Sequence, residues 1–361
     1  MNKLLIVVIS AGVVLATSVS LLGANPDPIG PTVYPYMVAA SNAPQVVKDS
    51  AMYVADGIDD NVEIQAAIDA GTLVQLSGGT FNLTTGLTLN HATTLEGQGH
   101  GGNPFNGTFG GTLLIQKANI DMITATSKAG FRVKDLAIRG GKGQYQGRGI
   151  VITGKPSSSD PVWRLDSIAV KHMAGHSVVL QDSGAGWITD SYLSDGDSTL
   201  LYINNSPDYV VSNTQIGPGW GAGTHGVEAH GNSIGAFTGL VIFNVERGLS
   251  LSTSAQISNS KVRDTRSYGI FSASGVSITG CIVANPNEDN LPLGSGIVIN
   301  NQQKVIINGC RIEDTGGNME YGIREIGTSD KNIFTSNVIT GYTTASITTV
   351  GTGTLVANNT D

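Results

Sequence analysis

The stretch FTGLVIFNVERGLSLSTSAQISNSKVRDTRSYGI, residues 237–270, contains the pattern that decides the fold. Two turn residues, Gly239 and Asn259, each have an apolar residue two positions earlier and another three positions later. A glycine followed by an aliphatic residue, at Gly248 and again at Gly269, comes after each of them. Short apolar runs bounded by Asn, Ser and Gly are typical of short β-strands joined by tight turns. The stretch therefore predicts repeating units of about three short strands each.

The same pattern recurs from residue 131 onward with a mean spacing of about 25 residues, which indicates a solenoid. The turn positions are Asp135, Ser167, Asp190, Asn213, Gly239, Asn259, Gly280, Gly309 and Ser336. Every residue two before or three after these turns is apolar. Such strands cannot bury their inner side alone, whereas stacked coils share a continuous core. The chain is therefore predicted to be an all-β, parallel β-helix solenoid of about ten coils.

A single helix is predicted ahead of the repeats, in the segment DDNVEIQAAIDAG, residues 59–71. Asp60 and Glu63 have the spacing of a capping box, and Gly71 follows as a stop signal. A helix of about ten residues is marginal alone, so it must pack against other elements. We expect this short α-helix, Asp60 to Ala70, to cap the N-terminal end of the solenoid, where open strand edges would otherwise be exposed.

The runs ADGIDDNVEIQAAIDA, LVQLSGGTFNL and LTLNHATTLEGQG, between Tyr53 and Gly99, resemble the opening of the pectate-lyase-like superfamily of right-handed parallel β-helix proteins. The resemblance implies a right-handed coil and a connection with carbohydrate. It does not imply one reaction, because the superfamily includes lyases, glycoside hydrolases, virus tailspikes and surface proteins without known catalysis. The fragment HGNSIG, residues 230–235, resembles the histidine motif of polygalacturonases, but the lysine expected downstream is absent.

The N-terminus and the composition predict an exported protein. Residues 1–24 have one lysine, an apolar run and then small residues, which favours a signal peptide over a membrane anchor. Residues 25–50 are expected to be a proline-containing linker or extended arm, and residues 51–361 the β-helix domain. We therefore expect a secreted or cell-surface protein, with no membrane span once the signal is cleaved. The net charge of −8 gives no reason to expect binding to nucleic acid.

Candidate site residues lie in the connections between the apolar residue three positions after each turn and the next glycine–aliphatic pair. These connections vary in length from about 7 to 14 residues. Variable loops on a regular scaffold are where function tends to accumulate. The candidate catalytic residues are Asp195, Asp197 and His172. The candidate substrate-binding residues are Lys171, His176, Trp220, His225, Glu246 and Arg247. The alternative is a purely structural role, in which these aspartates shape turns and the histidines are ordinary surface residues.

Three functions are compatible with this set. The first is an exported module that binds or processes polysaccharide or cell-envelope glycan at an envelope or particle surface. The second is a polysaccharide lyase or glycoside hydrolase, in which carboxylates act as acid and base or hold Ca²⁺. The third is a structural or adhesion subunit, for instance a homo-oligomer that assembles through coil ends. No cofactor is certain, and Ca²⁺ is the one candidate metal.

The two cysteines occupy the position just after the turn on neighbouring repeats. Cys281 and Cys310 are therefore expected to lie one above the other. A disulfide is geometrically conceivable, and export would permit it. We favour two reduced cysteines in an interior column of small residues.

Overall fold

The computed structural model describes residues 7–9, 12–14, 35–100, 111–154, 162–219 and 223–361. The chain forms two compact units, residues 1–34 and residues 35–361. In the first unit, strand β1 (Val7–Ile9) pairs antiparallel with β2 (Gly12–Val14). The rest of the predicted signal peptide lies outside the described residues. No helix in the described ranges is long and apolar enough to cross a bilayer.

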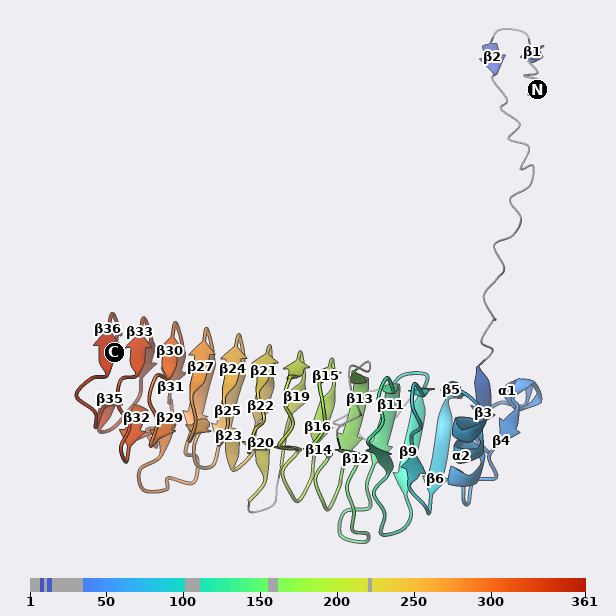
Figure 1. Ribbon diagram of the computed structural model, residues 1–361, viewed down its shortest axis with the longest axis horizontal. Helices are drawn as coiled ribbons and strands as arrows, with labels where there is room; N and C mark the ends of the chain where they lie inside the picture. Colours follow the sequence, from blue (N-terminus) through green and yellow to red (C-terminus); the bar gives the residue numbers. More distant parts are fainter. Residues whose placement is uncertain (1–6, 10–11, 15–34, 101–110, 155–161, 220–222) are drawn as a thin grey trace. The chain divides into compact units, whose positions relative to one another are not determined.

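The second unit is a parallel β-helix, with its strands following one another along the long axis (Figure 1). One face is a parallel sheet of eleven strands, which we call sheet C. Its strands are β7 (Leu87–Thr88), β10 (Ile123–Thr126), β12 (Ile150–Thr153), β14 (Val178–Gln181), β17 (Leu201–Asn204), β20 (His225–His230), β23 (Arg247–Leu251), β26 (Ile270–Ser272), β29 (Ser295–Asn300), β32 (Tyr321–Ile326) and β35 (Ala345–Thr348). The eleven strands agree with the predicted ten or so coils.

Two further ladders of parallel strands complete each coil, and we call them together sheet B. They share the bent strands β11 (Arg132–Arg139) and β13 (Trp163–Lys171). The first ladder contains β3 (Tyr36–Ala39), β4 (Tyr53–Val54), β5 (Leu73–Leu76), β8 (Thr94–Glu96), β15 (Gly186–Thr189), β18 (Tyr209–Ser212), β21 (Gly235–Thr238), β24 (Ala255–Ser258), β27 (Val276–Thr279), β30 (Ile306–Asn308), β33 (Ile333–Thr335) and β36 (Leu355–Ala357). The second contains β6 (Gly79–Leu83), β9 (Thr112–Gln116), β16 (Tyr192–Ser194), β19 (Gln215–Ile216), β22 (Val241–Phe243), β25 (Lys261–Thr265), β28 (Ile282–Pro286), β31 (Arg311–Glu313) and β34 (Val338–Thr340).

The bend between the two ladders of sheet B falls on the predicted turn residues. All nine have a positive φ, between 48° at Asn213 and 66° at Gly239. This left-handed conformation costs little for Gly, Asn and Asp, which occupy seven of the nine positions. The eighteen apolar residues that flank the turns are at most 1% exposed, so they form the continuous core. The predicted coil register is therefore confirmed.

The predicted cap is helix α2 (Asn61–Ala70), which packs against β3 and β5 at the N-terminal end (Figure 1). Its inner face buries Ile64 and Ile68. The predicted capping box does not form, because Asp60 makes no side-chain bond to the helix. Its carboxylate accepts hydrogen bonds from the backbone N–H groups of Gly57 and Asn82 instead. Asp60 thus fastens the helix to β6 rather than capping it.

The folded unit begins at Pro35 rather than at residue 51. The segment predicted as a linker contributes β3, which pairs with β4 and β5 in sheet B. It also contains helix α1 (Gln45–Ser50). These elements lack a clear period because β3 has only four residues and α1 buries none of its side chains. Their structure depends on the sheet to which they are joined.

Cys281 and Cys310 directly precede the in-register strands β28 and β31, and both are free and 1% exposed. Each sulfur lies near backbone carbonyls of the interior, Cys281 at 3.4 Å from Thr279 O and Cys310 at 3.6 Å from Asn308 O. The structure therefore agrees with the favoured prediction, which was two reduced cysteines in an interior column of small residues.

Candidate functional site

The predicted site residues fall into different parts of the coil. Lys171 is the last residue of β13, His172 follows it, and Asp195 and Asp197 follow β16. Together with Lys142 these residues form what we call the turn cluster. His176, His225 and Arg247 instead border or belong to sheet C. Trp220 lies outside the described residues. The candidate site residues therefore do not form a single cluster.

In the turn cluster both predicted catalytic carboxylates lie beside lysines. Lys142 Nζ lies 2.7 Å from Asp197 Oδ1, and the buried Lys171 Nζ lies 3.5 Å from Asp195 Oδ2. Asp195 also has a left-handed backbone with φ of 54°. Ion pairs and turn geometry account for these two carboxylates without assigning them a reaction, so their catalytic role stays a prediction.

His172 borders a cavity of about 400 Å³ beside the turn cluster, which Arg139, Lys142 and Gln144 also line. Burial lowers the pKa of His172, and the nearby Asp195 carboxylate opposes this effect. The imidazole is therefore biased toward its neutral form. His172 could accept a proton there, but no carboxylate bonded to its ring is observed among the described residues.

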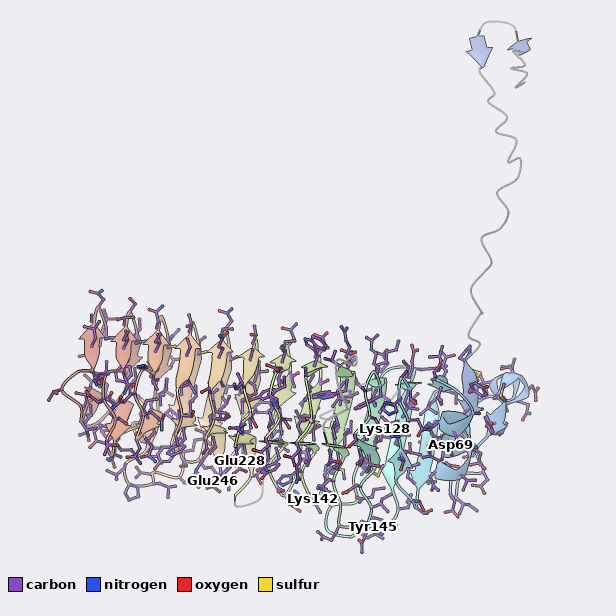
Figure 2. All side chains as sticks on the ribbon, viewed as in Figure 1. Asp69, Lys128, Lys142, Tyr145, Glu228 and Glu246 are labelled. Carbon is purple, nitrogen blue, oxygen red and sulfur yellow. The ribbon has the colours of Figure 1, made fainter. Side chains whose placement is uncertain are left out.

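Sheet C presents a denser polar group that we call the Glu228 cluster. Its members are His176, Thr199, Tyr202, His225, Glu228 and His230. Strand β20 has the sequence HGVEAH, in which Val227 and Ala229 are fully buried. Because side chains alternate along a strand, Glu228 and His230 point outward. In Figure 2 the labels of Glu228 and Glu246 lie on the lower side of the solenoid.

Glu228 is the centre of this cluster. Its Oε1 lies 2.9 Å from His230 Nε2, and its Oε2 accepts a hydrogen bond of 2.9 Å from Thr199 Oγ1. His225 Nδ1 lies 3.5 Å from Oε2 and has no other partner among the described residues. The side chains of Glu228, His225 and His230 are 23%, 13% and 33% exposed. A carboxylate thus lies between two imidazoles at a half-buried surface.

These neighbours keep Glu228 ionised. The His225 imidazole lowers the pKa of Glu228 most strongly, burial opposes it, and His230 and Thr199 lower it further, to about 2. At neutral pH the carboxylate therefore accepts hydrogen bonds and orients imidazoles, but it cannot donate a proton as a general acid.

Aromatic rings extend the cluster along the solenoid axis. His176 stacks on Tyr202 with ring centroids 4.8 Å apart, and Tyr202 lies 5.9 Å from the ring of His230. His176 Nδ1 contacts Thr199 O at 3.1 Å, and burial lowers the pKa of His176. The planes of His176 and Tyr202 are 16° apart, whereas the ring of His230 is tilted by 47° against Tyr202.

Arg247 lies one coil further, on β23, in register with His225. Its guanidinium lies 5.8 Å from the ring of Tyr268 and 6.0 Å from that of Phe271. The preceding residue, Glu246, accepts a hydrogen bond from Gly223 N and so shapes a neighbouring loop. Of the residues predicted to bind substrate, His176, His225 and Arg247 thus share a surface.

The sequence analysis did not select Glu228, Thr199 or Tyr202, and it noted His230 only within HGNSIG. The available signal was HGVEAH, a short strand with polar residues at alternating positions. Thr199 and Tyr202 are 29 and 26 residues before Glu228. Their proximity depends on coil register, with β17 pairing with β20. No group of three or more His, Cys, Asp or Glu residues in the described ranges is placed to hold a metal ion.

Comparisons with known proteins agree with this architecture. The family described as "Right handed beta helix region" matches residues 121–287. A comparison with curated proteins gives no match. Among solved structures, the A-module of mannuronan C-5 epimerase AlgE6 from Azotobacter vinelandii has a TM-score of 0.63 at 16% identity, over 84% of this chain and 96% of that one.

Two other solved structures are similar over much of the chain. Tailspike protein 2 from an Escherichia coli O157:H7 bacteriophage has a TM-score of 0.64 at 14% identity, over 77% of this chain and 40% of that one. The catalytic domain of a GH87 α-1,3-glucanase in complex with nigerose has a TM-score of 0.53 at 15% identity, over 85% and 67%. The chain thus has the right-handed parallel β-helix fold that the family model and these solved structures share.

Proposed function

We propose that this protein binds polysaccharide along the outer face of sheet C, at the Glu228 cluster. The observation that carries the proposal is the ionised Glu228 held between His225 and His230 at a partly exposed surface. Carboxylate oxygens accept hydrogen bonds from hydroxyl groups, and imidazoles both donate and accept them. Such a surface suits a ligand that carries many hydroxyls.

The shape of the surface also favours an extended ligand. Sheet C repeats its outward positions from coil to coil, at a strand spacing of roughly 4.8 Å. His176 precedes β14, and Tyr202 and His230 lie on the next two strands of sheet C, β17 and β20. A polymer lying along the axis would meet these polar groups on successive coils. The names of the similar structures, an epimerase of mannuronan and a glucanase bound to nigerose, support a polysaccharide ligand.

A catalytic role has one specific observation in its favour. His230 Nε2 lies 2.9 Å from Glu228 Oε1, which is the arrangement of a base oriented by a carboxylate. Hydrolysis through paired carboxylates needs a second acid or base, whereas Glu228 is the one carboxylate that the described cluster contains. If the site is catalytic, proton abstraction by an imidazole in a lyase reaction therefore fits better than hydrolysis.

Export remains part of the proposal. The predicted signal in residues 1–24 would place the solenoid outside the cytoplasm, where envelope or particle-surface glycans are available. Assembly into a homo-oligomer would multiply such sites along a surface.

The test is a polysaccharide panel with the protein from residue 25 onward, with and without Ca²⁺. Binding is measured by affinity electrophoresis, elimination by ultraviolet absorbance, and hydrolysis by reducing ends. We expect Glu228→Gln to weaken binding at least tenfold, because the amide loses the charge and part of the imidazole network. Asp197→Asn in the turn cluster is the matched control and should bind as the wild type does.

Three outcomes would contradict parts of the proposal. If no polysaccharide binds to the folded protein, the proposed function is wrong. If Asp197→Asn rather than Glu228→Gln abolishes binding, the site lies at the turn cluster. If reducing ends appear without absorbance, hydrolysis replaces elimination as the reaction.

A further inference from the structure

Arg247 is a cation on sheet C that has no carboxylate partner. No ion pair or hydrogen bond of its guanidinium occurs among the described residues, and its Nε is buried without a partner. The guanidinium is held over Tyr268 and Phe271. Stacking on aromatic rings leaves the planar fork of an arginine available for two parallel hydrogen bonds. The side chain is therefore already ordered but lacks an anion.

The adjacent coil supplies a polar side chain beside Arg247. His225 and Arg247 are register partners on β20 and β23. His225 Nδ1 is buried and lies 3.5 Å from the carboxylate of Glu228, so Glu228 already neighbours this nitrogen. Leaving a buried polar group without a partner is costly, so the unpartnered guanidinium of Arg247 is unusual unless a ligand satisfies it.

The geometry points to an anion subsite at Arg247, next to the Glu228 cluster, which makes the ligand an acidic polysaccharide. This inference rests on the proposed function and specifies its substrate class. The anionic group would be the carboxylate of a uronic acid or a sulfate ester, because both present paired oxygens to a guanidinium. A protein of net charge −8 gives no general attraction to such a polymer, so a local cation has to provide it.

Charges around the subsite set its orientation. Glu228 belongs to the same strand as His225, and its Oε2 is 3.5 Å from Nδ1, so an anion is disfavoured on this side of Arg247. Glu246, next to Arg247 in the chain, has its carboxylate directed to Gly223 N. Arg266 follows on the next coil, where its N–H bonds Val245 O. The anionic group is therefore expected beside Arg247 on the side of Tyr268, with neutral hydroxyls toward Glu228.

The experiment compares acidic polymers with matched neutral ones on the protein from residue 25 onward. The probes are a polyuronate, the same polymer with methyl-esterified carboxylates, and sulfated and unsulfated forms of one glucan. We expect at least tenfold tighter binding of one acidic form than of its neutral partner. Preference for the polyuronate identifies a carboxylate ligand, and preference for the sulfated glucan identifies a sulfate ester.

Arg247→Gln is the test variant, and Arg164→Gln is its matched control. Arg164 also stacks on an aromatic ring, 4.8 Å from Trp187, but belongs to sheet B. Arg247→Gln should remove the preference for the acidic polymer while binding of the neutral form stays unchanged; Arg164→Gln should keep both. Equal binding of acidic and neutral forms, or equal weakening of both by Arg247→Gln, would overturn the anion subsite but leave the polysaccharide function intact. Absence of binding to all four polymers would overturn both.

Discussion

The low pKa of Glu228 predicts a specific pH dependence of stability for the variant Glu228→Gln. Neighbouring His225, followed by His230 and Thr199, lowers this pKa from 4.5 to about 2. A carboxyl group whose pKa is lower in the folded state stabilises that state fully when the pH is above the pKa of the unfolded state. This stabilisation is lost as the pH falls through the pKa of the folded state. The difference in unfolding free energy between wild type and Glu228→Gln should therefore be near zero at pH 2 and should grow until about pH 5.

The size of the effect follows from the shift. A change of about 2.5 pKa units corresponds to ~3 kcal/mol at most, since one unit is worth about 1.4 kcal/mol. The Glu228 side chain is 23% exposed, so solvent screening reduces the contribution, and we expect ~1–2 kcal/mol. The glutamine side chain has nearly the same shape but no charge, which isolates the electrostatic part.

The assay is urea denaturation of both proteins between pH 2 and pH 7 at constant ionic strength. Glu96→Gln is the control, because Glu96 pairs with Lys134 on sheet B and its side chain is 26% exposed, close to that of Glu228. Exposed ion pairs of this kind contribute ~0.2–1 kcal/mol. A loss for Glu228→Gln that is the same at every pH, or that grows as the pH falls, would refute the reasoning.

Three further variants test the solenoid itself. Ile278→Asp puts an unpaired charge in a fully buried position and should cost more than ~4 kcal/mol, whereas Thr279→Asp on the exposed neighbour should melt like the wild type. Gly235→Ala places a Cβ 2.2 Å from the ring of the tyrosine one coil away and should cost ~1–3 kcal/mol; Gly275→Ala, with open space, should be neutral by thermal denaturation. Cys281→Ser should cost less than ~1.5 kcal/mol, since serines fill the same interior column on other coils; a larger loss would show that the sulfur has a specific packing role.

Much of the fold could be predicted because it is local and repeated. Gly, Asn or Asp at a turn such as Asn213 favours the left-handed backbone, and aliphatic neighbours such as Val211 and Ile216 mark the inner side. Each repeat gives the same information again, so one ambiguous repeat does not change the result. The predicted capping role of Asp60 was wrong, because its carboxylate accepts a hydrogen bond from the backbone N–H of Asn82, which belongs to a different segment.

The candidate site was less predictable, because its contacts join residues of different coils. Sequence spacing located the variable connections, and it therefore selected Asp195 and Asp197, which the structure pairs with lysines of other segments. Glu228 lies inside a strand, where no variable loop draws attention to it.

The sequence by itself determined the architecture, the coil register and the capped N-terminal end, because turn residues and alternating apolar residues act over a few positions. It also determined that any attraction to an acidic ligand has to be local, since the net charge is −8. Only the tertiary structure decided which side chains meet. Stacking brings Thr199, Glu228 and Arg247 onto one face although up to 48 residues separate them, because parallel strands in register align outward positions of successive coils.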